Sequence, residues 1–354
     1  MITRRENPAE RRSFAPWRKK DPPERILLIR FHAIGDVALV LPAAAALRAL
    51  HPSAHVALLT ADQTGELASA TTLFDRILAP PFPRHRAGRA WYALRTGMLV
   101  RSLGYDTILD LQRNSVSRIV RRIASPAAWG EFDRYAPLPA WARIVDTCRR
   151  SGFACAETPR PVALRSERQE SSRQLLARHG RTTERTLVVL NPAGLWSTRN
   201  WPVENYVQLG MHWRQRAPVQ FLLLGTVRMR ERAAAIAAGL SGDVIDLTGA
   251  TTLAEAFGCV AQADIMISED SGLMHAAWAA GVPIVALFGS SRHDWSAPYG
   301  SRAVTLHSGD LPCGACMEPA CRFGDVHCLT RHTPAAVLGE AIRLLQKTTH
   351  TTTD

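Results

Sequence analysis

The stretch that decides the fold is residues 263–288, which read ADIMISEDSGLMHAAWAAGVPIVALF. An apolar run from Ala263 to Ile267 leads into a short polar turn and then a helix-like run, which Gly281 ends. A second apolar run follows from Ile284 to Phe288. Short buried strands joined through a helix are typical of a parallel α/β sheet. The stretch therefore predicts a strand, turn, helix and strand in series.

The turn inside this unit has the composition of a phosphate site. Asp270 and Ser271 stand where a helix N-cap belongs, and Gly272 lets a ligand come close to the backbone. His275 falls in the first helical turn, which we expect to be exposed. A helix N-terminus carries unpaired N–H groups and a partial positive charge, so it suits a pyrophosphate. The alternative is an ordinary helix cap with no ligand.

The length and the pattern of apolar runs predict two α/β domains. The chain has 354 residues, of which 46% are hydrophobic, and this is enough for two cores. One series of strands and helices starts at Arg25 and a second at Thr186. The predicted divisions are a flexible basic arm (1–24), an N-terminal domain (25–165), a linker (166–185), a C-terminal domain (186–333), a final helix (334–347) and a tail (348–354).

The net charge of +12 and the isoelectric point near 10 favour anionic partners. We expect a cytosolic protein, because no apolar run is long enough to span a membrane and the N-terminus lacks a signal-type apolar segment. A nucleic-acid-binding protein is one alternative. It would need aromatic residues among the arginines for base stacking, and residues 113–122 have none. We therefore expect no nucleic acid partner.

Arginines without nearby acids mark a candidate acceptor surface. No acid lies between Asp110 and Glu131. Four arginines do, namely Arg113, Arg118, Arg121 and Arg122. On a helix, Arg118 and Arg122 would share a face, which could hold an anionic acceptor. The alternative is a solvated helix face.

Gly35 and Asp36 follow the first predicted strand directly. Gly35 permits a tight turn, and Asp36 stands at the start of the next helix. One reading makes Asp36 an N-cap. The other makes it a general base, which needs a reacting hydroxyl within hydrogen-bond reach. The segment is not a dinucleotide fingerprint, because the G-x-G-x-x-G pattern is absent.

A second polar loop follows the strand that starts at Thr186. Residues 191–202 read NPAGLWSTRNWP, and they include a hydroxyl at Thr198 and a cation at Arg199. Small residues, hydroxyls and a guanidinium suit phosphate oxygens. Pro202 is expected at the first position of the following helix. An ordinary loop with a surface arginine is the alternative.

The chain has seven cysteines, an odd number that argues against a complete disulfide framework. Four of them are clustered: Cys313, Cys316, Cys321 and Cys328, within the segment 313–328. Close cysteine pairs suit tetrahedral zinc, although this spacing differs from paired C-x2-C knuckles. A structural zinc site and a loop of reduced thiols both remain open.

With these segments in order, the chain resembles glycosyltransferase family 9, the ADP-heptose:lipopolysaccharide heptosyltransferases, from about Arg25 to Gln346. The resemblance rests on residues 26–30 with 35–37 and 41–42, on 191–194 with 199–202, and on 270–275 with 281–283, 288–289 and 298–300. It implies a GT-B architecture, with two Rossmann-like parallel-sheet domains that face a central cleft. The N-terminal domain would receive the acceptor and the C-terminal domain the nucleotide sugar, and the final helix would cross back to the first domain.

The resemblance also implies roles for residues. Asp36 matches the family's proposed general base, and Arg199 stands where better-known members have a phosphate-binding lysine. Asp270, Gly272 and His275 match donor-contacting positions. The implied reaction is an inverting transfer that requires no metal cofactor.

The implied donor is ADP-heptose, and the implied acceptor is a lipid-linked anionic lipopolysaccharide core. The protein would work at the cytoplasmic face of the inner membrane, which the basic charge suits. The alternatives are a GT-B enzyme that uses another nucleotide sugar or acceptor, and a family member without catalysis that serves as an assembly partner.

Overall fold

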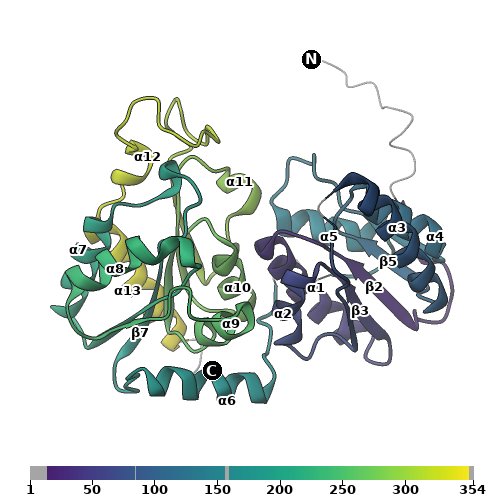
Figure 1. Ribbon diagram of the computed structural model, residues 1–354, viewed down its shortest axis with the longest axis horizontal. Coiled ribbons are helices and arrows are strands. Elements are labelled where there is room, and N and C mark those ends of the chain that lie inside the picture. Colours follow the sequence, from purple (N-terminus) through teal and green to yellow (C-terminus); the bar gives the residue numbers. More distant parts are fainter. Residues whose placement is uncertain (1–13, 84, 156–158, 351–354) are drawn as a thin grey trace. The chain divides into compact units, whose positions relative to one another are not determined.

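The computed structural model describes residues 14–83, 85–155 and 159–350. The chain forms two compact units, shown in Figure 1, with the boundary between Pro159 and Arg160. Two short segments, 34–39 and 70–72, belong to the second unit although they precede this boundary. Within the described ranges, no helix is long and apolar enough to cross a membrane.

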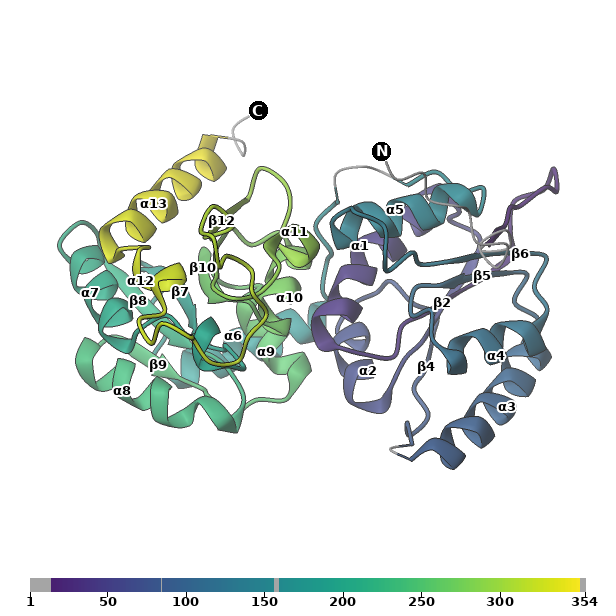
Figure 2. The ribbon, with the colours of Figure 1, turned by 90° about the horizontal axis from the view of Figure 1, so that it is seen from above.

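The first unit is built on a six-stranded sheet. In order across the sheet, its strands are β1 (Phe14–Ala15), β6 (Ala128–Glu131), β5 (Thr107–Asp110), β2 (Arg25–Ile29), β3 (His55–Leu59) and β4 (Arg76–Leu78). Only β1 runs antiparallel to its neighbour, and the other pairs are parallel. The helices are α1 (Ile34–Leu50), whose first six residues belong to the second unit, α2 (Asp62–Ser69), α3 (Arg86–Ser102), α4 (Ser115–Ala124) and α5 (Ala140–Arg150). Figure 2 shows α3 and α4 on one face of this sheet, with α1 and α5 on the other.

The second unit has a fully parallel six-stranded sheet. Its strands, in order, are β12 (Ala303–His307), β11 (Ile284–Phe288), β10 (Ile265–Glu269), β7 (Thr186–Asn191), β8 (Val219–Leu223) and β9 (Val244–Asp246). Its helices are α6 (Ser166–Arg178), α7 (Val203–Arg214), α8 (Arg230–Leu240), α9 (Leu253–Val260), α10 (Gly272–Ala280), α11 (His293–Ser296), α12 (His327–Thr330) and α13 (Pro334–His350). Two 3₁₀ turns, η2 (Ser197–Arg199) and η3 (Val227–Met229), complete it.

Both sheets are doubly wound, which confirms the predicted fold class. The strand order reverses its direction between β2 and β5 in the first sheet and between β7 and β10 in the second. In an open parallel sheet, the loops that follow the strands at such a reversal form the usual ligand site. The loops at residues 32–36 and 111–114 therefore occupy the switch point of the first unit. Those at 191–202 and 270–272 occupy the switch point of the second.

The central strands of each sheet are buried and mainly apolar, as in β2, β5, β7 and β11, whereas the edge strands are partly exposed. The first core includes Leu27, Ile29 and Ile108, all without exposed surface. The second core includes Val188, Ile267 and Trp201, which are equally buried. The apolar runs that predicted strands are thus the centres of the two cores.

Three predicted divisions look different in the structure. Residues 1–13 of the predicted arm lie outside the described residues, and Phe14–Ala15 forms a strand in the first sheet. The predicted linker contains α6, which packs against α9 in the second unit. The final helix, α13, contributes Val337 and Leu338 to the second core and packs against α7, so a crossing to the first domain is not confirmed.

Candidate active site

Ser271 caps the helix at the second switch point, as the sequence predicts. Its backbone is extended, and its hydroxyl accepts a hydrogen bond from the Met274 amide at 3.1 Å. The same hydroxyl donates to Asn191 Oδ1 at 2.6 Å. Asn191 in turn donates from Nδ2 to the Leu224 carbonyl at 2.7 Å. The N-terminus of α10 is therefore tied to the ends of β7 and β8, which fixes its direction at the end of the sheet.

The first turn of α10 packs closely against residues 34–35, which belong to the same unit. A Cβ atom on Gly272 would lie 2.9 Å from Ile34 Cβ and 3.2 Å from the Gly35 amide nitrogen. A Cβ atom on Gly35 would lie 2.5 Å from His275 Cδ2. Real Cβ atoms essentially never lie within 3.0 Å of another heavy atom, so a side chain at either position would force its neighbour to move. The turn that precedes Asp36 thus lies directly beside His275 and the helix N-terminus.

His275 is the fourth residue of α10 and is only 6% exposed, so the expectation of an exposed imidazole is wrong. Burial lowers the pKa of His275 below its ordinary value of 6.5, and the carboxylates of Asp270 and Asp36 oppose this shift. Its Nδ1 atom is buried without a hydrogen-bond partner among the described residues. A neutral imidazole suits hydrogen bonding to a ligand without adding a charge.

The lowered pKa predicts a loss of stability in acid. The fold favours the neutral imidazole, so its stabilisation is complete above about pH 6.5 and is lost as the pH falls below that value. Between about pH 7.5 and about pH 5.5, the free energy of unfolding should fall more in the wild type than in His275→Gln. Urea denaturation at a series of pH values measures both curves. Parallel curves for the two proteins would show that the pKa of His275 is not lowered in the folded protein.

Arg199 lies beside the cap and pairs with Asp270. Its Nη1 atom is 3.3 Å from Asp270 Oδ2, and both side chains are mostly buried, at 15% and 14% exposed. The guanidinium also lies over the Trp196 ring, 4.0 Å from its centroid. Stacking on an indole fixes the plane of a guanidinium and leaves its N–H groups directed outward. Arg199 is thus held next to the helix N-terminus, where a phosphate would meet both.

Thr198 does not have the exposed hydroxyl that a phosphate ligand needs. It is only 2% exposed. Its Oγ1 atom donates to the Glu318 carbonyl at 2.6 Å and lies 2.9 Å from Ser290 Oγ. The prediction that Thr198 contacts a phosphate through its side chain is therefore corrected to a structural role, which joins three loops. Pro202 is also displaced by one position, because it is the N-cap of α7 rather than its first residue.

Glu269 anchors the loop that carries Arg199, and sequence reasoning missed it. Its carboxylate is fully buried and pairs with Arg232, with Oε1 2.9 Å from Nη2. It also accepts hydrogen bonds from the backbone amides of Gly194 and Trp201, at 2.5 and 2.7 Å. Arg232 completes the network by donating to the carbonyls of Pro192 and Trp201. One carboxylate and one guanidinium therefore hold both ends of the loop.

Asp36 lies in the first turn of α1 at the switch point of the first sheet. The helix begins at Ile34, so Asp36 is its third residue and not the N-cap considered from the sequence. The preceding strand end is fixed by Gln112, whose Oε1 accepts from the Phe31 amide at 2.9 Å and the His32 amide at 3.4 Å. An amide side chain from the loop after β5 thus holds the turn that leads to Asp36.

Most of the arginines predicted to hold an acceptor already have acidic partners. Arg121 and Arg118 both bond to Glu131, the latter at 3.3 Å, and Arg113 pairs with Asp133 at 2.8 Å. Strand β6 lies next to β5, so it brings Glu131 back against α4. The acid-free surface expected from the sequence is therefore partly neutralised, and Arg122 is the exposed member of the set.

A buried carboxyl, Asp110, ends β5 near the same turn. Its Oδ1 atom accepts from the amides of Gln112 and Arg113 at 3.2 and 2.8 Å. Burial raises the pKa of Asp110 to about 6, while the Arg113 amide works in the opposite direction. Its position under the 111–114 loop gives it a structural role in shaping the first switch point.

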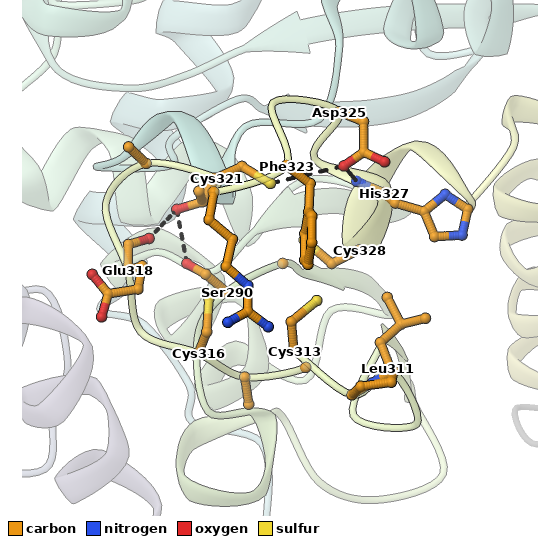
Figure 3. Close-up of a pocket in the computed structure, with 17 residues that line it drawn as sticks. Ser290, Leu311, Cys313, Cys316, Glu318, Cys321, Phe323, Asp325, His327 and Cys328 are labelled. Carbon is orange, nitrogen blue, oxygen red and sulfur yellow. Dashed lines mark hydrogen bonds between the residues drawn. The ribbon is translucent and has the colours of Figure 1, made fainter.

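The clustered cysteines line a pocket of about 500 Å³ together with Thr198 and Ser290. Figure 3 shows the four cysteines and Ser290 around this pocket. Burial raises the pKa of Cys328 to about 11, and the Cys316 and Cys321 thiols add to the shift. Across the described residues, no group of three or more His, Cys, Asp or Glu side chains is placed to hold a metal ion. The loop is held by hydrogen bonds instead, such as that from Ser197 Oγ to the Pro319 carbonyl at 3.0 Å. The predicted zinc site is therefore not confirmed.

Two doubly wound, mainly parallel sheets carried by one chain, each with polar loops at its switch point, match the GT-B architecture of solved family 9 structures. Within the GT-B class, the chain belongs to glycosyltransferase family 9 (heptosyltransferase), whose sequence model matches residues 94–327. It is thus a glycosyltransferase.

Individual relatives agree with this placement. Lipopolysaccharide heptosyltransferase 1 of Pseudomonas aeruginosa is 26% identical over 333 residues, which cover 84% of this chain and 88% of the relative. A family 9 glycosyltransferase structure from Veillonella parvula has a TM-score of 0.77 at 18% identity, covering 92% of this chain and 98% of that one. The structure of the E. coli ADP-heptose lipopolysaccharide heptosyltransferase II has a TM-score of 0.71 at 21% identity, covering 91% and 99%.

Proposed function

We propose that this glycosyltransferase moves a heptose from ADP-heptose to a lipid-linked lipopolysaccharide core acceptor. The observation that carries the proposal is the joint position of Arg199 and the α10 N-terminus at the second switch point. A guanidinium and unpaired helix N–H groups together match the charge of a diphosphate. The names of the relatives from P. aeruginosa and E. coli support the heptose and the acceptor.

The proposed reaction is a single inverting displacement. Asp36 removes the proton from an acceptor hydroxyl, and that oxygen forms a bond to the anomeric carbon. The bond from this carbon to the diphosphate oxygen breaks on the opposite face, and ADP leaves. The negative charge that develops on the diphosphate is stabilised by the α10 N–H groups and by Arg199. We assign His275 a hydrogen bond near the reacting centre, which its close approach to Gly35 supports.

In the proposed reaction, the helix N-terminus and Arg199 stabilise the negative charge on the diphosphate, so no metal is needed for this purpose. The acceptor is an anionic lipid, so we place the reaction at the cytoplasmic face of the inner membrane. A structural zinc at the four clustered cysteines remains a separate prediction, and metal analysis of the purified protein tests it.

A ligand-binding screen tests the donor. Wild-type protein should be stabilised by ADP-sugars more than by UDP- or GDP-sugars, as measured by thermal shift. In Arg199→Ala, calorimetry should show ADP affinity lowered about tenfold to a hundredfold, because a charge-assisted hydrogen bond contributes about 1.5–3 kcal/mol. The matched control is Arg216→Ala, which removes an exposed arginine two residues beyond the last residue of α7. Unchanged ADP affinity in Arg199→Ala would show that Arg199 does not bind the diphosphate. Stronger stabilisation by UDP-sugars would show that the donor is not an ADP-sugar.

A further inference from the structure

Helix α3 carries a stripe of apolar side chains on its outer face. Trp91 is 60% exposed, Met98 50% and Leu94 41%. These positions are three and seven residues apart, so they lie on one side of the helix. The opposite side is buried, with Val100 and Ala93 fully covered. The exposed stripe is thus separate from the core, and three large apolar side chains on one helix face need an explanation.

Helix α4 extends this surface. The two helices pack closely, since a Cβ atom on Gly97 would lie 2.9 Å from Ile123 Cβ. Arg101 Nη1 also donates to the Ile123 carbonyl at 3.1 Å, which ties α3 to the C-terminus of α4. Figure 2 shows the two helices side by side. Ile119 of α4 is 37% exposed and Leu99 of α3 is 42% exposed, so both add apolar area.

The charges on this pair of helices are of one sign. Neither α3 nor α4 contains an aspartate or a glutamate. Arg95 and Arg101 on α3 are exposed, as is Arg122 on α4. We call Trp91, Leu94, Met98, Leu99 and Ile119, together with these three arginines, the α3–α4 surface.

We propose that the α3–α4 surface docks the enzyme on an anionic lipid bilayer. A helix face with tryptophan and aliphatic side chains, flanked by arginines, lies in the plane of a bilayer interface with its apolar side chains in the acyl boundary. The arginines reach lipid phosphates while their aliphatic stems cover apolar surface. The absence of acids on both helices favours an anionic lipid over a neutral one.

The position of the surface fits the proposed function, on which this inference rests for the lipid-linked acceptor. Tyr92, on the buried side of α3, packs against Phe82 with ring centroids 5.1 Å apart. Phe82 in turn packs against His32 at 5.9 Å, in the loop that leads to Asp36. A bilayer at α3 would therefore lie near the loop that holds the candidate base, where a lipid-linked hydroxyl has to arrive.

Vesicle co-sedimentation tests the docking. The full-length protein should bind vesicles that contain phosphatidylglycerol, bind pure phosphatidylcholine vesicles weakly, and lose binding as salt rises. Trp91→Ser with Met98→Ser should weaken binding by roughly tenfold or more, since both side chains leave the acyl boundary. The matched control is Met211→Ser, which removes a side chain of similar exposure, 52%, from α7. Binding by the double variant equal to that of the wild type would overturn the proposal.

Two further readouts separate the possible failures. If the enzyme transfers sugar to a soluble, lipid-free acceptor but does not bind anionic vesicles, the docking inference is wrong and the proposed function stands. If it binds vesicles through this surface but transfers no sugar to either kind of acceptor, the proposed function is wrong. Sedimentation velocity gives the remaining outcome, because a dimer that the double variant dissociates would assign the surface to a second copy of the chain and overturn the lipid proposal.

Discussion

Asp36→Asn should lower kcat by a factor of about 10² to 10⁴, which is the usual contribution of a positioned general base. The amide keeps the shape of the carboxylate but cannot take a proton at neutral pH. The affinity for ADP should change little, because the diphosphate contacts proposed here come from Arg199 and the α10 N-terminus. Steady-state kinetics with a soluble acceptor fragment, together with calorimetry of ADP binding, separate these two effects.

A second acid in an equivalent place supplies the control. Asp62 is in the first turn of α2, which follows β3 as α1 follows β2. A carboxylate in a first helical turn stabilises the helix by about 0.3–1 kcal/mol through the macrodipole. Asp36→Asn and Asp62→Asn should therefore lose similar, small amounts of stability, and only the first should lose turnover. Full turnover in Asp36→Asn, or equal losses in both variants, would assign Asp36 to helix capping alone.

The sequence predicted the strands at both switch points because parallel strands in a doubly wound sheet are buried on both faces. An uninterrupted apolar run such as Ile26–Ile29 or Ile284–Phe288 has few other interpretations when polar turns bound it. The cap at Ser271 was also predictable, since an N-cap is a local interaction between residues three apart. Local rules thus located the helix N-terminus that we propose as the diphosphate site.

Electrostatic partners were not predictable in the same way, because they are set by the order of strands. The stretch from Asp110 to Glu131 suggested free arginines, yet Arg121 bonds to Glu131 across ten residues. This pairing exists because β6 lies beside β5, against which α4 packs. The sequence shows that Glu131 lies ten residues from Arg121, but it does not show that the fold brings the two side chains into contact. The acceptor contacts of Arg113, Arg118 and Arg122 remain predictions.

The role of Glu269 was hidden for a related reason. In the sequence, Ser268, Glu269 and Asp270 form one polar group at the end of a strand. Successive side chains on a strand point to opposite faces, so neighbours in this group have different surroundings. Glu269 is fully buried against Arg232, whereas Asp270 pairs with Arg199. Only the position of α8 reveals this difference, because it brings Arg232 within reach of β10 from 37 residues away.

Glu269→Ala should destabilise the second unit by about 3–5 kcal/mol, the usual cost of breaking a buried ion pair from one side. The substitution leaves the Arg232 guanidinium without its carboxylate. It also leaves the amides of Gly194 and Trp201 without their acceptor. Urea denaturation measures the loss. The control is Asp294→Ala, whose carboxylate pairs with Arg292 and is 46% exposed, so its loss should cost less than about 1 kcal/mol.

Two companion variants distinguish a broken pair from a simple cavity. The double variant Glu269→Ala with Arg232→Ala should recover part of the stability, because it removes the uncompensated charge. Glu269→Gln should keep the acceptor for the Trp201 amide and lose less than Glu269→Ala. If the double variant is less stable than Glu269→Ala by the full cost of a second independent substitution, Glu269 and Arg232 are not energetically coupled.

The functional consequence follows from the loop that this pair holds. Because Glu269 fixes residues 194 and 201 on either side of Arg199, Glu269→Gln should raise the KM for the nucleotide sugar more than it lowers kcat. A positioning role acts on donor binding, whereas a residue at the reacting atoms would act on turnover. The comparison is informative only in folded protein, so it is made at a temperature at which the variant retains its native circular dichroism. An unchanged KM would leave Glu269 with a purely structural function.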